Sequence, residues 1–162
     1  MIRDQSLEIR VGKRLQKKGL TIATAESSTG GLIAARLTDV SGSSAYVIGG
    51  VVAYADVVKQ QVLGVLEQTL IDHGAVSDPV ARQMADGARG LFKTDLALSV
   101  TGIAGPTGAT ATKPVGLTYV GLSAPDGTWV RRFVWEGSRS ENRHAAVEAA
   151  FCLLLDYLDG QL

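Results

Sequence analysis

The chain has 162 residues, 46% of them hydrophobic and 20% charged, which predicts one folded domain over residues 1–162 and excludes a disordered chain. Lys plus Arg equals Asp plus Glu at 16 each, so the charge gives no reason to expect nucleic acid or an anionic membrane as partner. One cysteine, Cys152, excludes a disulfide framework, and its apolar neighbours predict a buried side chain. With no membrane-length apolar segment and no signal-peptide core, we expect a cytoplasmic protein.

The first third of the chain predicts alternating helices and strands. Residues 5–19 carry apolar side chains at helical spacing and predict an amphipathic helix that ends near Gly19. A short buried strand is expected at 20–25, followed by a helix from about Gly30 to Thr38. Residues 44–54 predict a long or bulged strand, because paired glycines in a strand often mark a bulge or a close backbone approach.

The rest of the chain continues this alternation and ends with a hairpin and a helix. The predicted elements are helices at 56–64, 67–74 and 77–92, a buried strand at 95–100, a Gly/Thr-rich loop at 102–113, hairpin strands at 115–124 and 128–136, and a helix at 140–158. This order predicts an α/β fold, a three-layer α/β/α sandwich with a mixed, mostly parallel sheet of five or six strands. Apolar faces on both terminal helices would permit a homo-oligomer.

A hydroxyl-rich turn stands where the first strand meets the second helix. Its residues are Ser27, Ser28, Thr29, Gly30 and Gly31. Ligands of α/β sheets bind outside the carboxyl ends of the strands, and amides at the start of the next helix can hold an anion. The turn therefore predicts either a nucleophilic serine beside an anion site or, equally, a hydroxyl that caps the helix.

A serine nucleophile needs a base, and the next strand offers one. Tyr54 closes that strand and Lys59 follows at the start of a helix. A lysine partly withdrawn from water can be neutral near pH 7 and accept a proton, and Tyr54 could relay that proton or hold the two groups in line. Spacing alone favours the simpler interpretation, a solvated lysine and an interface tyrosine.

Two further segments could line the same site. Thr101, Gly102 and Gly105 follow the strand at 95–100, although a loop of this composition is also typical of an exposed connection. Arg139 and Arg143 stand at the start of the last helix, where cations oppose the helix dipole unless an anion binds. Exposed pairing of these arginines with Glu136 or Glu141 explains them equally well.

Several familiar sites are missing from the sequence. It has no P-loop, no dinucleotide-binding glycine pattern after a strand and no G-x-S-x-G elbow. His73 and His144 are not spaced as a metal-binding pair with each other or with Cys152. We therefore expect no metal and no cofactor.

Several multi-residue blocks in one order resemble the CinA C-terminal domain family, over residues 8 to 158. They read "AESSTGG", "GSSAYVIGGVVAYADVVKQQVLGV", "HGAVS", "VTGIAGPTGATATKPVG" and "GSR". Free-standing members of that family are nicotinamide-nucleotide amidases. The resemblance implies hydrolysis of the carboxamide of nicotinamide mononucleotide to nicotinate mononucleotide and ammonia, a step of pyridine nucleotide salvage, without a metal.

The resemblance also implies roles for single residues. It assigns Ser27 as the nucleophile, Tyr54 and Lys59 as the assisting pair, and Thr101 and Arg139 as substrate contacts. Together with the turn and loop glycines, the predicted substrate-binding set is Thr29, Gly30, Gly31, Thr101, Gly102, Gly105 and Arg139.

The chain departs from the family pattern at three places. Ser28 stands where Cys is usual, Gly137–Arg139 reads Gly-Ser-Arg for Gly-Asp-Arg, and 107–109 reads Thr-Gly-Ala for Asp-Gly-Gly. The last two departures bear on the substrate more than on the chemistry. Two alternatives stay open: a non-catalytic module that binds a nucleotide or phosphometabolite, and an amidase for a different small amide.

Overall fold

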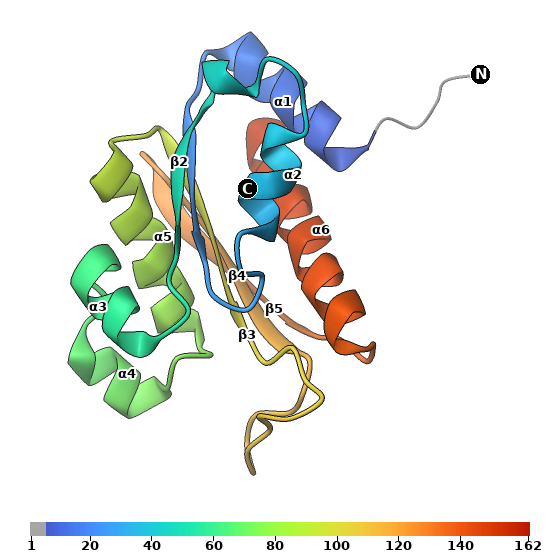
Figure 1. Ribbon diagram of the computed structural model, residues 1–162. Coiled ribbons are helices and arrows are strands. Elements are labelled where there is room, and N and C mark those ends of the chain that lie inside the picture. Colours follow the sequence, from blue (N-terminus) through green and yellow to red (C-terminus); the bar gives the residue numbers. More distant parts are fainter. Residues whose placement is uncertain (1–5) are drawn as a thin grey trace.

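A five-stranded mixed sheet lies between two layers of helices in the computed structural model, which describes residues 6–162 (Figure 1). The strands are β1 (Ile22–Glu26), β2 (Val47–Val52), β3 (Leu96–Gly102), β4 (Leu117–Ala124) and β5 (Gly127–Val134), in the order β2-β1-β3-β4-β5. β1 pairs in parallel with β2 and β3, whereas β3–β4 and β4–β5 are antiparallel. The predicted three-layer fold is confirmed, with five strands.

The helices divide between the two faces of the sheet. On one face lie α1 (Leu7–Lys18), α2 (Leu32–Thr38) and α6 (Arg139–Leu158); on the other lie α3 (Asp56–Leu63), α4 (Glu67–His73) and α5 (Asp78–Phe92) (Figure 1). A short 3-10 turn at Ser43–Ala45 precedes β2. Gln5, where the predicted first helix begins, lies outside the described residues.

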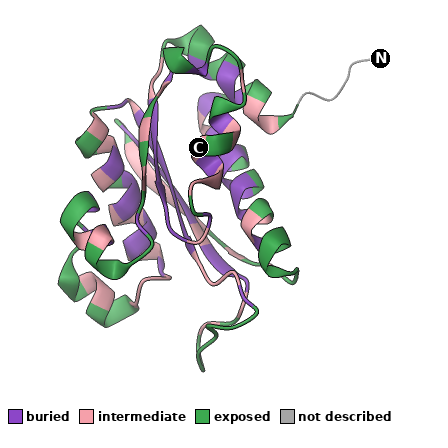
Figure 2. Cartoon of the chain, in the orientation of Figure 1, coloured by how far each residue is buried: buried purple, intermediate pink, exposed green. Residues whose placement is uncertain are grey.

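Each face of the sheet has its own apolar core. The larger core joins α1, α2 and α6 to the side chains of β3 and β4 that face them, and the smaller one joins α3 and α5 to the alanines of β1. Figure 2 shows the strands of the central sheet buried between green, exposed outer surfaces of the helices. Burying apolar surface on both faces explains why β1 and β3 read as continuous apolar runs.

The paired glycines of β2 mark the irregular strand that the sequence predicted. The register against β1 shifts between Ile22 and Ala23, which is the predicted irregularity. A Cβ on Gly50 would lie 2.2 Å from Thr24 Oγ1, and a Cβ on Gly49 would lie 2.6 Å from a ring carbon of Phe92. Only glycine leaves room for these two side chains against β2.

The prediction that Cys152 is buried is wrong. Its thiol lies on the exposed side of α6, between Phe151 and Leu153, which are both fully buried. A helix that packs on one side only completes a turn every 3.6 residues. One residue of a continuous apolar run in such a helix therefore faces solvent.

No helix in the described part of the chain, residues 6–162, combines the length and apolar character that a membrane span requires.

Candidate active site

A cavity of about 270 Å³ opens at the carboxyl edge of the parallel strands. β1 ends in Glu26, after which Ser27 and Ser28 line the cavity, while β2 leads to Tyr54 and β3 supplies Thr101 and Gly102. The chain leaves β1 toward one face of the sheet and reaches β3 from the other, so this is the topological switch point, where α/β sheets leave room for a ligand.

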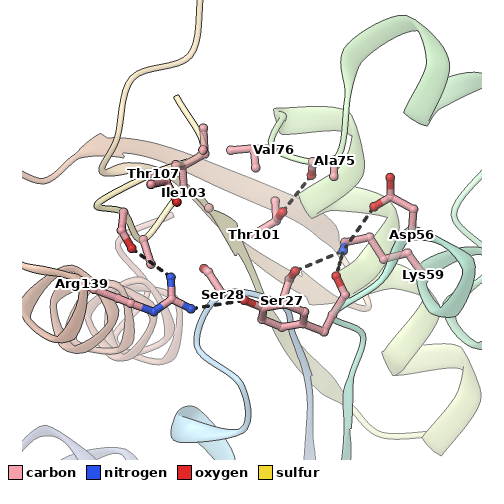
Figure 3. Close-up of a pocket in the computed structure, with 15 residues that line it drawn as sticks. Ser27, Ser28, Asp56, Lys59, Ala75, Val76, Thr101, Ile103, Thr107 and Arg139 are labelled. Carbon is pink, nitrogen blue, oxygen red and sulfur yellow. Dashed lines mark hydrogen bonds and ion pairs between the residues drawn. The ribbon is translucent and has the colours of Figure 1, made fainter. Parts of the chain in front are cut away.

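Ser27 and Lys59 meet inside this cavity. The Lys59 Nζ lies 3.1 Å from Ser27 Oγ, and both side chains are buried, Lys59 to 1% relative exposure and Ser27 to 8%. Figure 3 shows the two side chains pointing toward each other from α3 and from the end of β1. The solvated surface lysine that spacing alone favoured is not what the fold produces.

Three oxygens surround the Lys59 amine. Besides Ser27 Oγ, Nζ donates to the backbone carbonyls of Ala53 at 2.9 Å and Tyr54 at 3.1 Å. A carbonyl oxygen can only accept, so both carbonyls require an N–H. When the amine is neutral it has two hydrogens, both taken by these carbonyls, and its lone pair is left for the Ser27 hydroxyl. In its charged form Lys59 donates to all three oxygens, and in its neutral form the two carbonyls leave it one acceptor position, next to Ser27.

The surroundings of Lys59 shift its protonation equilibrium toward that neutral form. Burial lowers the pKa of the Lys59 ammonium from its ordinary value, because a charge in a shielded site loses its hydration. The Asp56 carboxylate, 3.6 Å from Nζ, and Tyr54 oppose this effect without overcoming it. A buried lysine with a lowered pKa beside a hydroxyl is the arrangement that activates a serine nucleophile.

The Ser27–Gly31 turn is fixed by a residue that sequence reasoning missed, Glu26. Its buried carboxylate accepts the amide hydrogens of Ile33 at 2.8 Å and Ala34 at 3.1 Å, so Glu26 satisfies the start of α2. No hydroxyl of the turn caps the helix; Gly31 is the N-cap residue, with φ of 100°. These helix amides are therefore not available to an anion.

Three predicted substrate-binding residues stand behind the cavity. Thr29, Gly30 and Gly31 are not among the residues that line it. The Gly30 amide donates to the Ser27 carbonyl at 3.1 Å, and Thr29 is fully buried. The structure places these residues in the support of the serine turn, where the left-handed φ values of both glycines make the turn sharp.

The loop after β3 forms another wall of the cavity. Thr101, Gly102 and Gly105, all predicted site residues, line it together with Ile103 and Thr107. The Thr101 hydroxyl donates to the Ala75 carbonyl at 2.8 Å, which ties the end of β3 to the segment before α5. A Cβ on Gly102 would lie 3.1 Å from Ser28 Oγ, so glycine keeps the two strand ends close.

Arg139 and Tyr54 meet at the mouth of the cavity. The Arg139 guanidinium donates to the Gly105 carbonyl at 3.0 Å and to the Tyr54 hydroxyl at 3.3 Å. In Figure 3, Arg139 and Lys59 lie at opposite ends of the cavity with Ser27 and Ser28 between them. Tyr54 is 61% exposed, and its backbone carbonyl rather than its hydroxyl contacts Lys59. Pairing of Arg139 with Glu136 or Glu141 is not made; Glu141 instead forms a capping box with Ser138.

Two more residues of α6 brace the site. Arg143, which the sequence suggested as an anion ligand, donates to the carbonyls of Ser28 at 3.1 Å and Thr29 at 2.9 Å. Asn142, which sequence reasoning missed, is 3% exposed and donates to the Ala104 carbonyl at 3.0 Å. The first turns of α6, residues 139–144, are polar throughout, so the sequence does not single out Asn142 for such a role.

The fold and the site together define a three-layer α/β domain with a buried serine–lysine pair at the switch point of its sheet. The chain belongs to the CinA C-terminal domain family, whose model matches residues 4–158.

Known proteins with the same domain agree in sequence and in fold. The chain is 48% identical over 98% of its length to a putative competence-damage inducible protein of Caldanaerobacter subterraneus, and 51% identical over 96% to one of Halothermothrix orenii. It spans 38% of the length of each of these relatives. A crystal structure of a competence/damage inducible protein from Agrobacterium tumefaciens matches with TM-score 0.88 and 39% identity, covering 98% of this chain and 99% of that one. A CinA superfamily protein from Klebsiella pneumoniae matches with TM-score 0.92 and 32% identity, covering 95% and 96%.

Proposed function

We propose that the chain is an amidase that hydrolyses the carboxamide of nicotinamide mononucleotide to nicotinate mononucleotide and ammonia. The observation that carries this proposal is the 3.1 Å contact between Ser27 Oγ and the buried Lys59 amine. The separation of Lys59 from Arg139 across the cavity suits a substrate with a reacting amide at one end and a phosphate at the other.

The first half of the reaction is attack by the serine. Neutral Lys59 accepts the Ser27 proton as Oγ bonds to the carboxamide carbon, which gives a tetrahedral oxyanion and a lysine ammonium. The ammonium then returns its proton to the departing nitrogen. The C–N bond breaks, ammonia leaves, and the acyl group stays on Ser27 as an ester.

The second half is hydrolysis of that ester. Lys59, neutral again, takes a proton from water as the water oxygen attacks the acyl carbon. Collapse of the second tetrahedral intermediate breaks the bond to Ser27 Oγ, which regains its proton from Lys59. The products are the free enzyme and a carboxylic acid, which ionises to the carboxylate by releasing a proton to water.

The oxyanion needs hydrogen-bond donors, and several amides in and near the Ser27–Gly31 turn are already used by other acceptors. The Ser27 amide already donates to the Val100 carbonyl, and the Gly30 amide donates to the Ser27 carbonyl. The Ile33 amide donates to the Glu26 carboxylate. Ser28 follows the nucleophile and lines the cavity, and its amide is not used in this way, so it is our candidate donor. Loss of one oxyanion donor costs about 3 kcal/mol of barrier, or about a hundredfold in rate.

The phosphate of the substrate is assigned to Arg139. Two of its five N–H groups are used by Gly105 and Tyr54, which hold the guanidinium at the cavity mouth and leave donors for an anion. In this proposal Tyr54 contributes its carbonyl to Lys59 and its hydroxyl to Arg139.

Ammonia release from nicotinamide mononucleotide by the purified protein, with a chelator present, tests the proposal. Turnover supports the amidase. Thermal stabilisation by the nucleotide without turnover supports a binding module instead. Turnover of other small carboxamides, but not of this nucleotide, supports an amidase of different specificity, to which the unusual 107–109 segment at the cavity wall would contribute.

A further inference from the structure

Asp56 is a charged residue of the cavity that the proposed reaction leaves without a role. It is the first residue of α3, three positions before Lys59, and it also lines the cavity. Its Oδ1 lies 3.6 Å from Lys59 Nζ (Figure 3), and its side chain is 57% exposed. The carboxylate therefore reaches from solvent toward an amine that is buried.

The other groups around Lys59 do not supply the negative charge that the Asp56 carboxylate supplies. Tyr54, the other titratable group acting on Lys59 in the described chain, carries a phenol rather than a carboxylate, and Arg139 across the cavity carries a guanidinium. The Glu26 carboxylate, at the end of β1, is committed to the first amides of α2. On α5, which packs against α3, Asp78 and Arg82 pair with each other at 3.3 Å.

An ammonium at Lys59 consequently has one anionic neighbour. When Ser27 gives up its proton, a positive charge forms on a side chain that is 1% exposed, where water compensates it poorly. Asp56 is the group that can compensate this charge. The same attraction acts in the resting protein, where it favours the charged amine over the neutral one.

We propose that Asp56 is a positioning residue that acts through Lys59. It sets the pH at which the Lys59 amine becomes neutral, and it stabilises the ammonium that forms during attack by Ser27. The second role rests on the proposed function, whereas the first belongs to the free protein. The two roles have opposite consequences for activity, since the carboxylate lowers the neutral fraction of the amine but assists the proton transfer.

The first role is tested without substrate. Lysine side-chain NMR signals of the full chain are followed as a function of pH, and the Lys59 signal is assigned by its loss in Lys59→Met. In Asp56→Asn the Lys59 signal is expected to titrate at lower pH than in the wild type. The control Asp39→Asn makes the same charge change at the C-cap of α2 and should leave the titration unchanged. An unshifted Lys59 signal in Asp56→Asn would overturn the proposal.

The second role is tested by the pH–rate profile for ammonia release. In Asp56→Asn the acid limb of the profile should move to lower pH, while the rate at the plateau falls roughly three- to tenfold with little change in KM. Asp56→Glu should recover part of the plateau rate. A normal plateau in Asp56→Asn would contradict this role. A wild-type protein without turnover would defeat the proposed function, while the NMR titration would still decide the first role.

Discussion

Lys59 and Ser27 are 32 positions apart in the chain, yet their Nζ and Oγ atoms lie 3.1 Å apart in a buried cavity. The fold creates this contact because β1 and β2 are parallel neighbours. Ser27 directly follows β1, and Lys59 reaches back from the first turns of α3 to the carbonyls that follow β2. The contact is thus a consequence of sheet register.

The protonation of Lys59 should appear in the pH dependence of stability. Its pKa in the folded protein is lowered from 10.5, so the unfolded chain binds more protons between the lowered value and 10.5. The free energy of unfolding of the wild type, relative to Lys59→Met, should therefore increase as the pH rises through this window and level off above it. Denaturant unfolding of both proteins at several pH values measures the difference. A difference that is constant with pH would show that the fold does not disfavour the ammonium.

Arg139 should affect binding of the phosphate more than the chemistry. Arg139→Ala should raise KM for nicotinamide mononucleotide about ten- to a hundredfold, the value of a charge-assisted hydrogen bond, with a smaller change in kcat. Its effect should be much smaller on the riboside that lacks the phosphate. The control Arg132→Ala removes an exposed arginine of β5 and should change neither constant. Equal effects on nucleotide and riboside would exclude the phosphate as the partner of Arg139.

Glu26 should contribute to stability through the start of α2. In Glu26→Gln one carboxylate oxygen becomes an NH2 group facing a backbone N–H, and the unpaired amide should cost about 1–3 kcal/mol of unfolding free energy. Chemical denaturation measures this loss. Glu136→Gln, at an exposed position, is the control and should stay within about 0.5 kcal/mol of the wild type. Equal stability of the two variants would mean that the Glu26 carboxylate is not needed to hold α2.

Two glycines of α5 provide a matched test of how α3, and hence Lys59, is held. A Cβ on Gly87 would lie 1.9 Å from the Leu63 carbonyl at the end of α3, whereas a Cβ on Gly90 meets nothing within 4 Å. Gly90→Ala should raise the unfolding free energy by about 0.5–1 kcal/mol through helix propensity. Gly87→Ala should lower it by about 1–3 kcal/mol and also reduce turnover, because α3 must shift. Similar stabilities for the two variants would contradict this close packing.

The sequence was most informative where a local pattern decides the structure. Alternating apolar strands and helices predicted the three-layer fold, and the glycine pair of β2 predicted the register shift of that strand. Cys152 was wrongly predicted as buried because an apolar run does not reveal which of its members faces water.

Long-range contacts could not be read from the sequence in the same way. Glu26 caps α2 across an intervening turn, and Asn142 binds the loop after β3 from α6. These roles depend on where the chain returns in space, and a single polar residue gives no local pattern that identifies its partner. The family resemblance pointed to Ser27 and Lys59 together, and the structure supplies the physical reason, a buried amine whose hydrogens are held by two carbonyls.

The most direct measurement compares ammonia release by Ser27→Ala and Ser28→Ala with that of the wild type. Both serines line the cavity, but of these two only Ser27 has a hydrogen bond with Lys59, so the two variants remove neighbouring hydroxyls that differ in this contact. Ser27→Ala should lower kcat by about a thousandfold or more while keeping the folded state, and Ser28→Ala should retain most of the activity. Undiminished turnover in Ser27→Ala would contradict the account.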